Sequence, residues 1–423
     1  MTALSRIAGF VCIRCGAKYA ADVHIDSKGC PICQDTAPAN LQPVYPGTGA
    51  NLTALQKPTN ASLWRHATYL PCRANDAVSL GEGDTPLLKA ETIGQILGVP
   101  YLSIKDEGRN PTWSHKDRFS TVAVSVARIQ GAKVIATASS GNAGASLAAY
   151  AARAGLRCVV ATFAGTAGPM LSQIRRYGAT VLPLVNKMDR WALLAEGAAQ
   201  LGWFVTSPCY APVVGSHPVG IEGYKTMAYE IIEQSDGEVP DWCVMPVCYG
   251  DALAGLWLGF KELFEAGHIS RLPRLVAAEV HGSLSDALSR GVDRLDEQRI
   301  SFETLAVSIG TPRSTYQALN AIRESYGCAV PVNNDSLLEL QKLLASSEGV
   351  FAELASVTPL AAIRELRKQN VISAEDRVVA IVTASGLKDL DRSNDPSSTY
   401  PTFPTIKDAW HSLKSEQGSL SSI

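Results

Sequence analysis

The chain has 423 residues, of which 18% are charged and 46% hydrophobic, and its formal net charge is −2. This composition excludes a disordered protein, and the charge gives no basis for binding nucleic acid or an anionic membrane. No apolar run approaches the roughly 20 residues that span a bilayer, and residues 1–11 make a poor secretory signal. We therefore expect a cytoplasmic, globular enzyme with two or three domains.

Four of the ten cysteines form two close pairs near the N-terminus. Two residues separate Cys12 from Cys15 and Cys30 from Cys33, and 14 residues lie between the pairs. Four thiolates from two tight turns suit a tetrahedral ion and leave no position open for water. Disulfides or a redox Cys-x-x-Cys are the competing interpretations, but thiols in a cytosolic chain stay reduced. The spacing therefore predicts a structural zinc ribbon over about residues 9–36.

Composition also suggests where the chain divides. Residues 34–62 are rich in Pro, Gly, Asn and Thr, which indicates a linker or an extended arm. The Pro- and Ser-rich tail holds one short amphipathic stretch, Ile406–Leu413, which we expect to pack on the surface. We assign a zinc-ribbon module to 1–40, the linker and the start of a large domain to 41–125, a small α/β domain to 126–210, the rest of the large domain to 211–395, and a C-terminal arm to 396–423.

Short β-rich segments alternate with helical patterns from residue 101 onward. The expected strands cover residues 101–105, 133–138, 157–163, 180–185, 203–206, 242–247, 275–280 and 377–383. The expected helices include residues 119–129, 143–154, 168–177, 190–201, 223–233, 253–266, 316–326, 336–346 and 359–368. This alternation predicts parallel sheets with helices on their faces. The expected fold class is therefore α/β, with two doubly wound units.

Lys116 lies between the strand at 101–105 and the helix at 119–129. Connections of this kind are where an α/β sheet exposes reactive groups. A lysine considered alone is more often a solvated surface residue, so the rest of the chain has to decide its role.

Three other segments place small or polar residues at the end of a strand. Ser139–Asn142 opens an alanine-rich helix and suits a carboxylate. Cys248–Ala252 has the same layout and suits a phosphate, provided that the Asp251 side chain points away. Thr383 and Ser385 follow a buried strand, at the end where α/β proteins bind ligands. In isolation, tight turns and capping hydroxyls explain each segment equally well.

Together these segments resemble the fold-type-II pyridoxal-phosphate (PLP) enzymes, and most closely the threonine synthases. The family's Glu-Gly-x-Thr-Pro-Leu segment is matched by Glu82–Leu87, and its lysine segment, Asn-Pro-Thr-Gly-Ser-Phe-Lys-Asp-Arg, by Asn110–Arg118 at seven of nine positions. Its Ser-Ser/Thr-Gly-Asn loop matches Ser139–Asn142, and Glu222–Thr226 and Gly386–Asp389 also resemble the family. The likeness covers about residues 80–390, and many family members also carry a zinc-ribbon-like N-terminus.

The resemblance implies a role for each segment. Lys116 would bond covalently to PLP and later move protons, because a neutral amine is a good nucleophile. Asn142 would hydrogen-bond the ring hydroxylate, and Thr383, with Ser385 as the second candidate, would face the pyridine nitrogen. A hydroxyl there favours elimination and replacement over transamination. Ser139 and Ser140 would hold the substrate carboxylate, and the cofactor phosphate would contact Cys248, Tyr249, Gly250, Asp251 and Ala252.

The sequence also departs from the family pattern close to these residues. Trp113 stands where the family has Gly and His115 where it has Phe, and Cys248 and Asp251 replace glycines. We expect the Trp113 indole to reshape the substrate pocket. His115 is either a packed ring, which we favour, or a proton carrier.

The expected activity is that of a PLP-dependent carbon–oxygen lyase of the threonine synthase type, which converts O-phosphohomoserine to threonine and phosphate. A cysteate synthase-like replacement, a dehydratase or ammonia-lyase, and a non-catalytic paralogue are the alternatives. The expected partners are an amino-acid substrate and a second copy in a homodimer, with no nucleic acid and no membrane.

Overall fold

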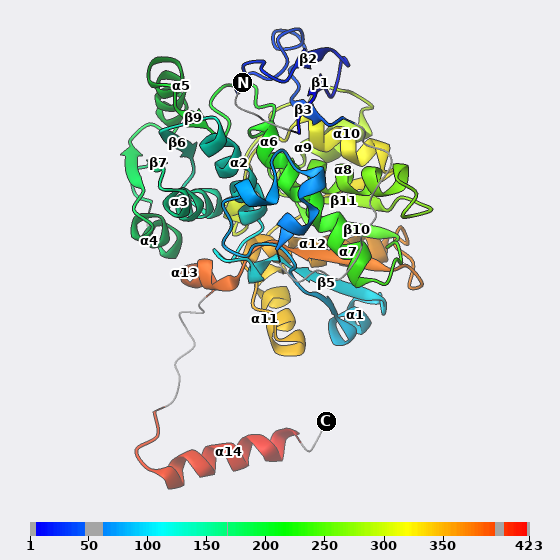
Figure 1. The fold of residues 1–423 in the computed structure, drawn as a ribbon. Coiled ribbons are helices and arrows are strands. Elements are labelled where there is room, and N and C mark those ends of the chain that lie inside the picture. The colour runs from blue at the N-terminus through cyan, green and yellow to red at the C-terminus, as the bar shows by residue number, and fades with distance from the viewer. Residues whose placement is uncertain (1–5, 47–61, 167, 394–401, 421–423) are drawn as a thin grey trace.

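The computed structural model describes residues 6–46, 62–166, 168–393 and 402–420. Strands of the described chain form three separate sheets (Figure 1). The first is antiparallel, with the order β2-β1-β3, and comprises β1 (Gly9–Cys12), β2 (Lys18–Ala20) and β3 (Leu41–Val44). Part of the expected linker is thus a strand, because buried Leu41 pairs with Cys12. Residues 47–61 of that linker lie outside the described residues.

A six-stranded sheet forms the centre of the larger body, with the order β12-β11-β10-β13-β5-β4. Its strands are β4 (Leu87–Lys89), β5 (Leu102–Asp106), β10 (Trp242–Pro246), β11 (Arg274–Glu279), β12 (Cys328–Pro331) and β13 (Val378–Val382). All pairs are parallel except β4 with β5. Every residue of β10 and β13 is buried, which follows from helices covering both faces of the sheet.

The two faces of this sheet pack on different helices. Alternate residues of β10 divide between them: Cys243 and Met245 join the core beneath α7 (Thr226–Gln234) and α8 (Asp251–Glu265), while Val244 faces the opposite core. The second core includes α1 (Glu91–Leu97), α11 (Leu337–Glu348) and α12 (Thr358–Lys368). The remaining helices of this body are α6 (Pro218–Ile221), α9 (Ser283–Ser289), α10 (Tyr316–Glu324) and α13 (Leu390–Ser393).

The third sheet is parallel, with the order β8-β7-β6-β9. Its strands are β6 (Val134–Ala138), β7 (Arg157–Phe163), β8 (Thr180–Leu184) and β9 (Phe204–Val205). Its helices are α2 (Lys116–Ile129), α3 (Asn142–Ala154), α4 (Pro169–Arg176) and α5 (Asp189–Leu201). The α/β fold class with two parallel-sheet units is therefore confirmed.

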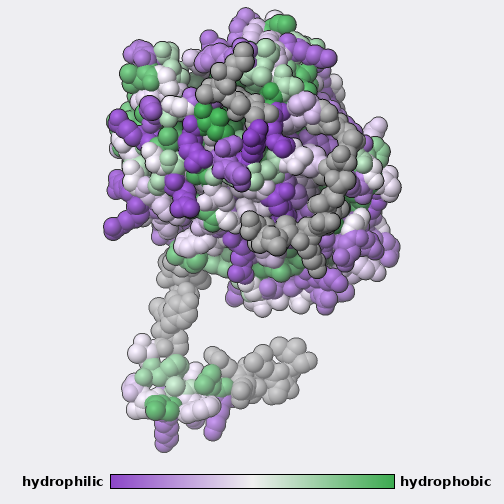
Figure 2. All heavy atoms as spheres, in the orientation of Figure 1, coloured by the Kyte–Doolittle hydropathy of each residue, from purple (hydrophilic) through white to green (hydrophobic). Residues whose placement is uncertain are grey.

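The C-terminal helix α14 (Ile406–Leu420) presents the apolar side chains of its first half to solvent (Figure 2). Ile406, Trp410 and Leu413 are 80%, 59% and 49% exposed. The expectation that this stretch packs on the surface is therefore wrong for the described residues. Within the described part of the chain, no helix is long and apolar enough to cross a membrane.

Candidate active site

Lys116 is the first residue of α2, and the loop before it is bonded to the end of β13. The His115 amide donates to the Thr383 carbonyl at 2.8 Å, and the Ser385 amide donates to the Trp113 carbonyl at 3.0 Å. These bonds place the lysine at the carboxyl edge of the large sheet, where α/β ligands bind. Its Nζ donates to the Tyr224 hydroxyl at 3.4 Å.

A small pocket of about 30 Å³ adjoins the lysine. It is lined by Lys116, Phe119, Ser120, Thr137, Ala143, Leu147, Thr206, Ser207, Ser216 and Tyr224. The lining side chains thus offer hydroxyl groups, apolar atoms and the amine of Lys116. Burial raises the pKa of Tyr224 well above the usual value, so this side chain is a neutral phenol.

α2 is held in position by a buried ion-pair network. Arg118 donates to Glu107 at 2.7 Å and to Glu230 at 2.6 Å, and all three side chains are fully buried. Lys105 also donates to Glu230, at 2.7 Å. Burial opposes ionisation of Glu230, but the two cations outweigh it and hold the pKa of this carboxyl well below its usual value. Removing either partner would strand a buried charge, so the network fixes α2 against α7.

Asn142 starts α3 and faces the large body. Its Nδ2 donates to Glu353 Oε2 at 2.7 Å, while its buried Oδ1 has no protein partner. The Ser308 hydroxyl donates to the other oxygen of Glu353. A buried polar atom is normally paired, so the free Oδ1 is available to accept from a polar group of a ligand.

Thr383 follows β13 and is supported by the segment that carries Glu353. Its hydroxyl lies 2.9 Å from the Ser356 hydroxyl, which also accepts from the Ala384 amide at 2.9 Å. The segment 353–356 therefore positions both Asn142 and Thr383. Sequence reasoning missed Glu353 and Ser356; a lone acidic residue between apolar neighbours was the available signal.

The loop before α8 is shaped by Gly250 and by the hydrogen bonds of Asp251. Gly250 has φ +79°, and an added Cβ would lie 2.2 Å from the Cβ of Ala318, so the loop requires glycine here. Asp251 accepts from the Ser216 amide and hydroxyl, at 3.0 and 2.7 Å, and from Gln317 at 2.5 Å. These donors occupy both carboxylate oxygens, while the first N–H groups of a helix have no intrahelical partner.

Two of the expected site residues, Ser139 and His115, have local structural partners, and a third, Trp113, is exposed. Ser139 Oγ accepts from the amides of Gly141 and Gly144, at 3.2 and 3.1 Å, and thereby caps the turn. His115 packs 5.5 Å from Tyr224, measured between ring centroids, and burial lowers its pKa well below the usual value. Trp113 is 46% exposed and has φ +67°, which explains why a glycine suits this position in the family it resembles.

The other residues expected to bind the cofactor or the substrate lie in the loops after the strands, with fewer side-chain contacts. Ser140 and Tyr249 are half-buried. Cys248 lies in the same loop, and burial raises the pKa of its thiol to about 11. Ala252 is buried in the first turn of α8. Ser385 caps the next turn by accepting from the Leu387 amide at 3.3 Å.

The four paired cysteines converge at the edge of the first sheet. One sulfur from each of Cys12, Cys15, Cys30 and Cys33 lies within 4.8 Å of the other three. The Cys12–Cys33 and Cys15–Cys30 sulfurs are each 3.8 Å apart. Four ligands at about 2.3 Å from a tetrahedral zinc are about 3.8 Å from one another, so this donor set fits zinc.

The fold and the site define a PLP-dependent enzyme. Residues 78–384 match the family described as "Pyridoxal-phosphate dependent enzyme", and the chain belongs to that family. The cofactor fits the residues present, because the free Asn142 Oδ1 offers a polar contact and the Gly250 loop offers amides for a phosphate.

Within this family, the chain is similar to threonine synthases. The chain is 36% identical to the threonine synthase of Methanocaldococcus jannaschii, over 78% of this chain and 81% of that protein. It is 33% identical to the threonine synthase of Methanosarcina acetivorans, over 94% of this chain and 97% of that protein. Among solved structures, serine racemase from Dictyostelium discoideum matches with a TM-score of 0.58 and 25% identity, over 72% of this chain and 92% of that one. Threonine deaminase isoform 2 from Solanum lycopersicum matches with a TM-score of 0.62 and 21% identity, over 80% of this chain and 94% of that one, and supports the fold.

Proposed function

We propose that this enzyme is a PLP-dependent carbon–oxygen lyase of the threonine synthase type. It removes a leaving group from an amino acid by elimination, with or without replacement, and O-phosphohomoserine is the first candidate substrate. The observation that carries the proposal is the Lys116 amine at the carboxyl edge of the large sheet, in a chain whose curated relatives include threonine synthases at 33–37% identity.

The cofactor would be held by four parts of the chain. Lys116 would bond to it, Asn142 and Thr383 would contact its ring, and the amides of residues 248–252 would bind its phosphate. When bound, PLP supplies the electron sink that stabilises a carbanion next to the amino group. Glu353 and Ser356 are positioning residues, because they fix the Asn142 amide and the Thr383 hydroxyl.

Proton transfer belongs to Lys116 and its neighbour. The Nζ of Lys116 takes the proton from the α-carbon of the substrate. The Tyr224 hydroxyl, 3.4 Å away, accepts a hydrogen bond from this amine and directs it into the pocket. Ser139 and Ser140 remain the candidates for the substrate carboxylate. Trp113 and His115 flank Lys116 and remain candidates for substrate contact, although neither lines the small pocket described above. Because His115 packs against Tyr224 as a neutral ring, it is assigned to packing and not to proton transfer.

We further propose that Cys12, Cys15, Cys30 and Cys33 bind a structural zinc ion, supported by the sulfur spacing. Four thiolates leave no open position for chemistry. A homodimer and a cytoplasmic location complete the proposal.

The test is a panel of substrates added to the holoprotein. O-phosphohomoserine, O-phosphoserine, serine and threonine are compared by phosphate, ammonia and product formation. Threonine and phosphate from O-phosphohomoserine would establish the first candidate. Turnover of O-phosphoserine or serine alone would instead favour a replacement or dehydratase reaction, and cofactor binding with no turnover would favour a non-catalytic paralogue.

A further inference from the structure

The strand β3 of the N-terminal module is anchored to the rest of the enzyme at both of its ends. Asn40 precedes the strand and Tyr45 follows it, and both side chains are buried. Between them, Leu41 belongs to an apolar cluster that also contains Val126 of α2 and Val219 of α6. The module therefore packs directly on α2, the helix that begins with the proposed cofactor lysine.

At the far end of β3, the Tyr45 hydroxyl reaches the turn that carries Tyr224. It donates to Glu222 Oε2 at 2.7 Å, and the same oxygen lies 2.7 Å from Lys225 Nζ. Glu222 and Lys225 are both buried, and the ammonium of Lys225 lies 4.7 Å from the centroid of the Tyr45 ring. Between them in the same turn stands Tyr224, whose hydroxyl accepts from Lys116.

The ion pair of Glu222 and Lys225 is tied to the large body on its other side. Lys225 Nζ donates to Glu262 Oε1 at 2.9 Å and to the Tyr69 carbonyl at 2.8 Å. Burial opposes the charge of Lys225, but the two carboxylates outweigh it and raise the pKa of its ammonium. The Tyr45 hydroxyl is the contribution of the N-terminal module to this network.

The turn that holds this pair also packs tightly against α2. An added Cβ at Gly223 would lie 1.8 Å from the Arg118 carbonyl oxygen and 3.2 Å from Val122 Cγ2. Closely packed interiors transmit strain. Because so little space separates the turn from the helix, a shift of the turn changes the placement of Tyr224 relative to Lys116.

The near end of β3 reaches the loop before α8. Asn40 Nδ2 donates to the Ser216 carbonyl at 3.0 Å and lies 3.4 Å from Gln317 Oε1. The side chains of Ser216 and Gln317 both donate to the Asp251 carboxylate, at 2.7 and 2.5 Å. An added Cβ at Gly215 would lie 2.7 Å from Asn40 Nδ2 and 3.0 Å from Asp251 Oδ1. These polar groups therefore meet at one point of the backbone, directly behind the loop.

We propose that Asn40 and Tyr45 are positioning residues, through which the N-terminal module orients the active site. Tyr45 fixes the turn that places the Tyr224 hydroxyl beside Lys116. Asn40 fixes the loop 248–252. This assignment rests on the proposed function, which gives Tyr224 and the loop their roles. Neither Asn40 nor Tyr45 touches the reacting atoms, so each acts through the residues that it holds.

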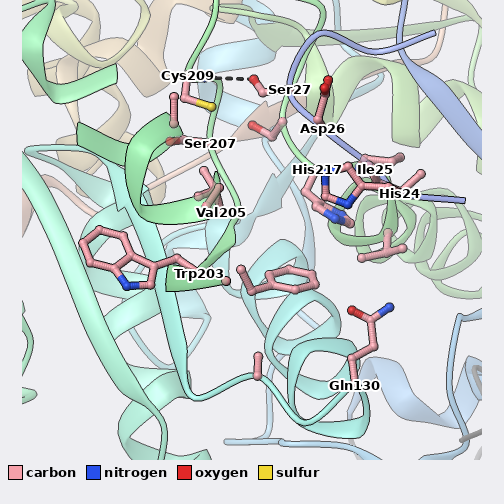
Figure 3. Close-up of a pocket in the computed structure, with 18 of the residues that line it drawn as sticks. His24, Ile25, Asp26, Ser27, Gln130, Trp203, Val205, Ser207, Cys209 and His217 are labelled. Atoms are coloured by element: carbon pink, nitrogen blue, oxygen red, sulfur yellow. Dashed lines mark hydrogen bonds between the residues drawn. The ribbon is translucent and has the colours of Figure 1, made fainter. Parts of the chain in front are cut away.

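Two other hydrogen bonds supply matched controls. Figure 3 shows a second contact between the module and the body, in which the Cys209 amide donates to Ser27 Oγ at 2.8 Å. Ser27→Ala loosens the module without removing a bond to the turn or to the loop 248–252. Within the body, the Tyr150 hydroxyl donates to Glu82 Oε2 at 2.8 Å, and both residues are buried. Tyr150→Phe therefore matches the loss of a buried tyrosine–glutamate bond.

The first experiment measures phosphate release from O-phosphohomoserine by the full-length holoprotein. Tyr45→Phe should lower kcat by roughly 3- to 30-fold with little change in KM, since a small misplacement of a catalytic group costs up to about 100-fold. Because Tyr45 acts through Tyr224, adding Tyr45→Phe to Tyr224→Phe should cause no further loss of kcat. Losses that multiply, or an equal loss of kcat in Tyr150→Phe, would overturn the assignment of Tyr45.

The second experiment does not depend on turnover. Hydrogen exchange followed by mass spectrometry should show faster exchange at residues 222–226 in Tyr45→Phe, by about threefold or more, and no change there in Ser27→Ala. Unchanged exchange in Tyr45→Phe, or equal acceleration in Ser27→Ala, would overturn the assignment of Tyr45.

Titration of the apoprotein with PLP tests the other end of β3. Asn40→Ala should weaken PLP binding by about threefold or more, while Ser27→Ala leaves it unchanged. Gln317→Ala breaks the same contact from the body side, so it should also weaken PLP, and the two changes should not add. Wild-type affinity in Asn40→Ala, or fully additive losses, would overturn the assignment of Asn40.

Failure of this inference differs from failure of the proposed function. Wild-type exchange and PLP affinity in both variants of an active lyase would refute the positioning roles and leave the lyase intact. A protein that bonds PLP but turns over none of the amino acids would refute the lyase. Exchange at residues 222–226 and PLP affinity would then still decide whether Tyr45 and Asn40 hold their segments.

Discussion

Replacing Gly250 with Ala tests whether the loop before α8 holds the cofactor phosphate. The residue has φ +79°, which costs an L-residue roughly 1–2 kcal/mol. The new Cβ would also meet the Ala318 Cβ at 2.2 Å, and relieving such overpacking costs roughly 1–3 kcal/mol. We therefore expect Gly250→Ala to lower the free energy of unfolding by about 2–5 kcal/mol and to weaken PLP binding at least tenfold.

A second glycine separates the cost of the positive φ from the cost of the clash with Ala318. Gly349 also has a positive φ, +68°, but an added Cβ would meet nothing within 4 Å. Gly349→Ala should cost about 1 kcal/mol and leave PLP binding unchanged. Adding Ala318→Gly to Gly250→Ala removes the atom that clashes, so PLP affinity should partly recover, even though a glycine inside α10 costs about 1 kcal/mol by itself.

Urea denaturation gives the stability of each variant, and titration of the apoprotein with PLP, followed by absorbance, gives the affinity. If Gly250→Ala bound PLP as tightly as the wild type while losing stability, the phosphate would have to lie elsewhere and the assignment of residues 248–252 would be refuted.

Four further predictions follow from particular side chains. Tyr224→Phe should retain bound PLP but lower kcat by roughly 10- to 100-fold with little change in KM; a pH profile identical to the wild type would contradict the role given to this hydroxyl. Metal analysis should find one zinc per chain, and Cys15→Ser should lower both zinc content and melting temperature. Trp113→Gly should stabilise the protein by about 1 kcal/mol in urea melts, because it relieves a positive φ; lower stability would argue against strain. His217 is held neutral down to about pH 3 in the folded state, whereas the unfolded chain binds the proton below about 6.5. The wild type therefore loses stability as the pH falls from 6.5 toward 3, and His217→Phe should lose about 1.3 kcal/mol less than the wild type between pH 7 and 5.5; equal losses would contradict a buried, neutral ring.

Local patterns predicted the parts of the fold that depend on local sequence. Periodicity located eight of the strands, β5 to β11 and β13, and most of the helices to within a few residues. The strand-to-helix loops located Lys116 and Asn142. The pattern was weaker for short or atypical elements. β12 has only four residues and ends in Pro331, and α1 contains Gly94, so neither was expected.

Contacts between distant segments escaped sequence reasoning. Glu353 and Asn142 are 211 residues apart, and Ser356 reaches Thr383 from a different element. Such pairs depend on tertiary placement, for which no local pattern exists. The positive φ of Trp113 was hidden as well, because an indole gives no indication of a left-handed backbone. The contact of the N-terminal loop 21–27 with Cys209 is a further case, since the cysteine spacing predicts only the proposed metal site.

The attachment point of the cofactor is the most direct test of the whole account. The holoprotein is reduced with borohydride, digested, and searched by mass spectrometry for a peptide that carries the reduced cofactor. The account predicts that the modified lysine is Lys116, and that Lys116→Ala leaves no modified peptide. Modification of another lysine, such as the buried Lys225 or Lys388, or of none in a protein that retains PLP, would contradict it.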